Sequence, residues 1–255
     1  MVNRLTKGTY MYRTTPVLAL GSMVLTMGSW AMAPMAAASV NIPFKSPSDK
    51  PAPRRASTSQ GASRGGLCDS AATAESASVK ALLPESHYGL TAVERPTIVA
   101  YLPETSATEV FFSLKDEAKQ LHFETSLPIS GKAGLFSFQL PAQAPALEPS
   151  KHYQWFLAVK CNGELRPSSP FIDGWVQRVI PNASVATIVA QAPSIAQAIS
   201  LGEAGFWYDT IATLTQLKRQ QPQNSEIAQS WRNFLGWTAL NPQELDTLTT
   251  SNVLQ

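Results

Sequence analysis

The chain has 255 residues, with 20 Lys and Arg, 18 Asp and Glu, and two cysteines. Its first 38 residues hold three of the basic residues and no acidic residue, so the remainder is nearly neutral. The formal charge of +2 therefore does not indicate a nucleic-acid partner, and we expect none.

Residues 1–38 have the pattern of a signal peptide. Basic residues precede an apolar stretch over residues 17–35, and Ala36-Ala37-Ala38 ends it in small side chains. The alternative is an uncleaved membrane anchor, although glycine, serine and threonine dilute the apolar stretch. We expect export and cleavage near Ala38, with the mature protein in the periplasm or secreted.

Residues 39–66 predict a disordered linker rich in Pro, Ser and Gly. Such a segment offers little apolar surface to offset the entropy cost of ordering it. Its charge is mostly positive, because Lys and Arg outnumber the single acidic residue. It is either a solvated linker or an electrostatic contact with anionic lipid or glycan through Arg54, Arg55 and Arg64.

Residues 67–181 predict an antiparallel β-sandwich domain. Six strands are expected between turns rich in Pro, Gly or acidic residues: 97–102, 109–115, 119–127, 135–140, 152–162 and 171–180. No helical pattern separates these strands, so a parallel α/β sheet is not expected. Trp155 shares a strand face with Cys161, and this is the basis for an immunoglobulin-like alternative.

The two cysteines, Cys68 and Cys161, are predicted to form a disulfide. An even cysteine count in an exported chain favours bridging. Cys161 shares its strand face with Trp155, Leu157 and Val159, so it points toward the core. Two separate buried thiols are the alternative. A catalytic thiol is disfavoured because apolar neighbours do not stabilise a thiolate.

Residues 182–255 predict a small helical unit, because the apolar residues change to helical spacing. Pro193 and Pro222 are expected to interrupt the helices, and Asn224 or Ser225 to cap the helix that follows the second break. Two apolar stripes are expected to pack on each other and on the sandwich: Trp207, Ile211 and Leu214, and Ile227, Trp231, Phe234 and Leu235.

Several stretches in combination point to a known family. They include LLPESHYGLTAVERPTIVAYLPE (82–104), LEPSKHYQWFLAVKC (147–161), GWVQRV (174–179) and GFWYDTIATLTQL (205–217). The chain resembles an uncharacterised, mostly cyanobacterial family of secreted proteins with a domain of unknown function. The resemblance implies a β-rich domain followed by helices, outside the cytoplasm, and it brings no established activity.

No catalytic residue, cofactor or metal is predicted. The sequence has no G-x-S-x-G elbow and no Gly-rich phosphate loop. Three histidines and two distant cysteines do not have metal-ligand spacing. His122-Phe123-Glu124 has the H-x-E form of a zinc deaminase but lacks the paired cysteines of that site.

The candidate binding residues are Asp173, Trp175 and Arg178. Trp175 follows a glycine and is close to polar residues, which favours an exposed ring able to stack on a sugar; the alternative is a core residue. Asp173 is either a functional carboxylate or part of a turn. These features favour a non-catalytic extracytoplasmic binding or structural module acting on a protein or a cell-envelope glycan. The alternative is a glycan-acting hydrolase with an unrecognised carboxylate site.

Overall fold

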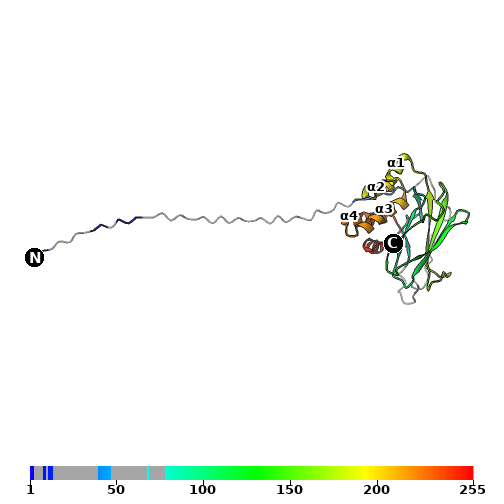
Figure 1. Cartoon of the computed structure of the whole chain (residues 1–255), viewed down its shortest axis with the longest axis horizontal. Helices are drawn as coiled ribbons and strands as arrows, with labels where there is room; N and C mark the ends of the chain where they lie inside the picture. Colours follow the sequence, from blue (N-terminus) through cyan, green and yellow to red (C-terminus); the bar gives the residue numbers. More distant parts are fainter. Residues whose placement is uncertain (3–7, 10, 14–39, 47–67, 69–77, 255) are drawn as a thin grey trace. The chain divides into compact units, whose positions relative to one another are not determined.

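Figure 1 shows the computed structural model of the chain, in which residues 1–2, 8–9, 11–13, 40–46, 68 and 78–254 are described. The predicted signal peptide falls almost wholly outside these residues. The linker beyond residue 46, with Arg54, Arg55 and Arg64, also lies outside them. The fold described below belongs to the unit from Ala37 to Gln255.

Two sheets form the β domain of the described chain. The five-stranded sheet has the order β2-β8-β7-β4-β5, with β2 (Tyr88–Thr91), β4 (Glu109–Asp116), β5 (Leu121–Pro128), β7 (His152–Val159) and β8 (Phe171–Arg178). The three-stranded sheet has the order β1-β3-β6, with β1 (Lys80–Ala81), β3 (Thr97–Leu102) and β6 (Gly134–Gln139). Every pairing is antiparallel except β2 with β8, which is parallel. A β-rich domain of two sheets, without a closed barrel, confirms the predicted class.

The two sheets pack through alternate apolar residues. The rings of Phe112 on β4 and Phe138 on β6 lie with their centroids 4.9 Å apart. Tyr153, Trp155 and Leu157 are buried along one face of β7, as the period-two pattern predicts. The core of the sandwich is therefore built from the faces that the sequence pattern identifies.

Gly174 lies within the regular strand β8 and not in a turn. It pairs with Trp155 across the β7–β8 ladder. A Cβ atom at this position would lie 2.2 Å from Leu83 Cδ1 and 2.7 Å from Trp155 Cζ2. Glycine is required here because the indole ring of Trp155 occupies the space that a side chain would need.

Helices follow the sheets, as predicted, and Figure 1 shows α1 to α4 gathered on one side of the strands. Asn224 caps α4, its side chain accepting the backbone N–H groups of Glu226 and Ile227. Pro193 and Pro222 fall in the breaks after α1 and α3. The helices are α1 (Ala183–Val189), α2 (Ile195–Glu203), α3 (Trp207–Gln220), α4 (Ser225–Leu235) and α5 (Pro242–Thr250).

The start of α3 anchors the helices to the sandwich. Trp155 Nε1 donates to the Tyr208 hydroxyl at 2.7 Å, and that hydroxyl donates to the carbonyl oxygen of Trp175 at 2.9 Å. Trp207 Nε1 donates to Leu82 O at 3.0 Å. Burial raises the pKa of Tyr208, so its hydroxyl stays protonated and can continue to donate. The helical unit is thus docked, as the apolar stripes predict.

Residues 40–46, here called the N-terminal strap, pack on the helices. Ile42 is fully buried and Phe44 is 8% exposed, with its ring edge-on to Trp207 at 4.9 Å between centroids. Trp237 Nε1 donates to Ile42 O, and the N–H of Lys45 donates to a carbonyl of α2. This part of the expected linker is therefore ordered, because its two apolar side chains have a site to fill.

Cys68 and Cys161 form the predicted disulfide, with their Cα atoms 5.1 Å apart. Strand β7 ends at Val159, so Cys161 lies just beyond the strand and not within it. Both cysteines are partly buried against the main core. The bond ties residue 68 to the β7–β8 connection.

Candidate functional site

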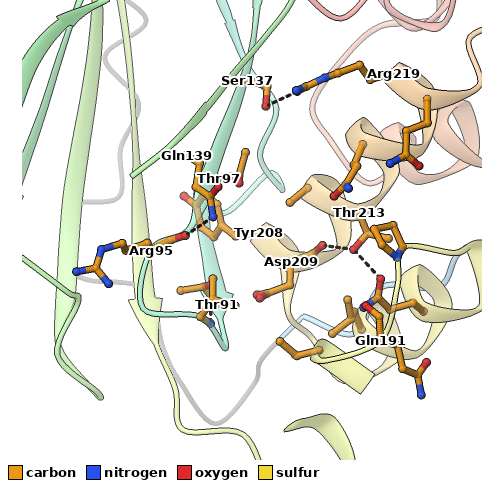
Figure 2. A pocket seen from close by; sticks show the side chains of 18 residues that line it. Thr91, Arg95, Thr97, Ser137, Gln139, Gln191, Tyr208, Asp209, Thr213 and Arg219 are labelled. Atoms are coloured by element: carbon orange, nitrogen blue, oxygen red, sulfur yellow. Dashed lines mark hydrogen bonds between the residues drawn. The ribbon is translucent and has the colours of Figure 1, made fainter. Parts of the chain in front are cut away.

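A polar pocket of about 620 Å³ lies between the three-stranded sheet and helices α1 to α3 (Figure 2). This volume is within the range of small-molecule sites, about 300–1,000 Å³. Thr97, Ser137 and Gln139 come from the sheet, and Asp209 and Thr213 come from α3. The pocket therefore exists only because α3 is docked beside the sheet.

Amide and hydroxyl side chains dominate the lining of this pocket. Each amide offers both a donor and an acceptor, and each hydroxyl does the same. Gln191, Gln216 and Gln220 are exposed, and among the described residues their side-chain amides make no hydrogen bond within the protein. The backbone carbonyl of Gln191 accepts Gln197 Nε2 at 3.1 Å. The other amides and hydroxyls of the lining are Gln139, Gln197, Thr91, Thr97, Ser137, Thr213 and Tyr208.

The carboxylate of the pocket is Asp209, in the first turn of α3. It is 9% exposed, and Oδ2 accepts the backbone N–H of Ala92 at 3.0 Å. Burial raises the pKa of Asp209 to about 6, although the bonds from Ala92 and from the hydroxyl of Thr91 lower it. Asp209 thus joins α3 to the end of β2, and it carries a charge at neutral pH.

Two arginines line the pocket and differ in how they are used. Arg95 is tied to the protein, since its guanidinium donates to Pro141 O at 3.3 Å and to Ala144 O at 3.2 Å. Arg219 is exposed and, among the described residues, donates to Ser137 Oγ at 3.4 Å. Figure 2 shows Arg219 reaching from α3 toward Ser137. Arg219 therefore keeps donors available for a ligand.

Trp175, expected as an exposed stacking residue, is not exposed. Its side chain is 9% exposed. It packs in a second cluster with Tyr88 and Leu90 of β2 and with Val185 of α1. The expectation is wrong on exposure because the indole packs among residues of strand β2 and helix α1, and strand β2 was not predicted.

Asp173 and Arg178 lie on β8 and do not line the polar pocket. Asp173 Oδ2 accepts Gln154 Nε2 at 2.7 Å, and burial raises the pKa of Asp173. Arg178 donates to Leu147 O at 2.7 Å and to Glu94 Oε1 at 3.0 Å. Arg178 thereby ties two loops together, while its Nε is buried without a hydrogen-bond partner among the described residues.

Sequence reasoning did not identify the polar pocket, because four separate parts of the chain build it. These are residues 91–97, 137–139, 189–201 and 208–220. A local signal was present on α3, where Gln216 and Gln220 are four residues apart and share a helix face. Two such glutamines are common on solvated helices, so their spacing alone does not indicate a site.

The described residues contain no group of three or more His, Cys, Asp or Glu side chains placed to hold a metal ion. In the same part of the chain, no helix combines the length and the apolar character needed to cross a membrane. The chemistry available in the pocket is hydrogen bonding and ion pairing.

Comparison with known proteins confirms one part of the motif resemblance, the domain of unknown function. No curated protein and no solved structure matches the chain. A family model described as Domain of Unknown Function (DUF928) matches residues 59–250, which include nearly all of the β domain and the helices. The chain therefore belongs to the DUF928 family.

Proposed function

We propose that this protein is a non-catalytic, extracytoplasmic binding module that holds a hydroxyl-rich ligand, a segment of cell-envelope glycan, in the polar pocket. One observation carries the proposal: a pocket of about 620 Å³ is lined mainly by amide and hydroxyl side chains. Sugar hydroxyls donate and accept in the same way as these side chains, so each can be paired when water leaves.

The charges in the pocket support binding over glycan hydrolysis. Most glycosidases need two carboxyl groups, separated by roughly 5–10 Å across the cleft. Among the described residues that line the pocket, Asp209 is the single carboxylate, and one of its oxygens already accepts the Ala92 N–H. A second carboxyl to activate water or to protonate the leaving group does not come from this lining.

Export is part of the proposal and rests on the pattern in residues 1–38. N-terminal sequencing of the protein recovered from its cells tests it, with a mature chain starting near Ser39 as the expected result. A chain that keeps Met1 in the membrane fraction would contradict cleavage.

Titration calorimetry with hexasaccharides released from the cell envelope tests the binding site. Gln191→Ala and Gln216→Ala truncate exposed amides from two separate segments of the lining, the α1–α2 connection and α3, so neither should disturb the core. Each lost hydrogen bond is worth about 1 kcal/mol, so each variant should bind roughly fivefold more weakly. Gln143→Ala is the matched control, an exposed glutamine outside the pocket lining. Absence of binding, or equal affinity in all four proteins, would refute the proposed function.

A further inference from the structure

A second pocket adjoins the polar pocket at the end of α3. Its volume is about 550 Å³, and it lies between the α3–α4 connection and the segment that follows α5. Arg219 lines both pockets. Two cavities of similar size thus share one lining residue, Arg219.

Two adjacent cations line the second pocket, Lys218 and Arg219. Lys218 is 7% exposed, and its ammonium donates to Thr249 O at 2.7 Å. In the described part of the chain, neither cation has a carboxylate within 4.0 Å, whereas Lys80, Lys160 and Arg178 each do. Burial lowers the pKa of Lys218, as expected for a charge without a counter-ion.

The hydrogen bond from Lys218 to Thr249 O uses only some of the N–H donors of the Lys218 ammonium. An ammonium has three N–H donors, and Thr249 O takes one of them. Burying a positive charge costs free energy unless an opposite charge pairs with it. The partial negative charge of the carbonyl groups at a helix C-terminus offsets only part of that cost. Ser225 and Ser251 add hydroxyl groups around the same cavity. This combination suits an anionic group carried by an otherwise polar molecule.

We infer that the two pockets are successive subsites for one acidic polysaccharide chain. Sugar hydroxyls occupy the polar pocket, and a carboxylate of a following sugar occupies the second pocket, which Lys218 and Arg219 line. The inference rests on the proposed function and extends it, because it names the ligand as an acidic glycan and gives the direction in which the chain runs along α3.

The test compares envelope hexasaccharides whose carboxylates are free with the same hexasaccharides after methyl esterification. Esterification removes the charge and keeps the ring hydroxyls, so it isolates the proposed contact. We expect the free acid to bind wild type at least tenfold more tightly than the ester. Arg219→Gln should remove most of this preference, so that the variant binds acid and ester with affinities within about threefold of each other. Lys218→Met should act in the same direction.

Arg219 is exposed, so Arg219→Gln is not expected to unfold the protein, and it is decisive if Lys218→Met proves unstable. Lys132→Gln is the matched control, an exposed cation outside both pockets, and it should keep the full preference. Equal binding of acid and ester, or a preference that survives Arg219→Gln, overturns the inference. The proposed function still stands in that case if Gln216→Ala weakens both ligands. If neither ligand binds, both fail.

Discussion

Replacing Gly174 by alanine should destabilise the sandwich more than its single added methyl group suggests. The new Cβ would lie 2.2 Å from Leu83 Cδ1 and 2.7 and 2.8 Å from two atoms of the Trp155 ring. Trp155 cannot easily move, because it is fully buried and its Nε1 donates to Tyr208. Overpacking a core costs about 1–3 kcal/mol, and three contacts below 3 Å place this site near about 3 kcal/mol.

Calorimetric melting of the folded protein measures this loss. A cost of about 3 kcal/mol corresponds to a fall of roughly 6–12 °C in the melting midpoint for a domain of this size. Leu83→Ala removes the nearest methyl group, so the double variant should lose less stability than the sum of the two single variants. Gly236→Ala is the control, because Gly236 ends α4 in an ordinary αR conformation and is exposed. Our reasoning would be refuted by an unchanged midpoint for Gly174→Ala, or by strict additivity with Leu83→Ala.

Three further predictions follow from buried groups. Replacing Cys68 and Cys161 by alanine should cost up to about 4–5 kcal/mol by the chain-entropy account, since the bond closes a loop of 93 residues. Two free thiols in non-reducing peptide maps of the protein recovered from its cells would contradict the bond itself. Trp231→Ala should cost roughly 3–5 kcal/mol because Trp231 is fully buried, and an unchanged melting midpoint would count against its docking. The pKa of Asp209 is about 6 in the folded protein and 3.8 in the unfolded chain, because burial favours the protonated carboxyl. The folded protein is therefore most stable, with respect to this group, below about pH 3.8, and it loses that stability as the pH rises through 6. The unfolding free energy of Asp209→Asn relative to wild type should therefore increase by up to about 3 kcal/mol between pH 4 and pH 7 in urea titrations, and parallel pH curves would argue against a buried carboxylate.

Most strands and helix boundaries could be predicted because their signals are local. Alternation places Trp155 on a buried face, and Pro222 followed by Asn224 marks the end of one helix and the start of the next. Strand β2, only four residues long, was missed because it is buried throughout and so shows no alternation. Its parallel pairing with β8 joins residues nearly ninety positions apart in register, such as Tyr88 with Trp175. No local sequence pattern predicts a parallel pairing between strands so far apart in the chain.

The candidate site was harder to predict than the fold. Asp173 and Trp175 attract attention in the sequence because carboxylate and indole groups often serve in binding. The structure assigns Trp175 to packing against β2 and α1, and it assigns the polar pocket to glutamines and threonines that are unremarkable singly. Their role depends on α3 lying beside the sheet, which is set by hydrogen bonds of Trp207 and Tyr208 to distant residues.

The N-terminal strap sets an order of events during synthesis. Ile42 O accepts from Trp237, 195 positions later, and Val40 O accepts from Asn233, 193 positions later. A ribosome adds about 5–20 residues per second, so the strap exists for roughly 10–40 s before its partners are made. During this interval Ile42 and Phe44 have no helices to cover them, and they are open to chaperones. The segment made early in the chain is therefore among the last to reach its place, and its docking closes a contact that spans most of the chain.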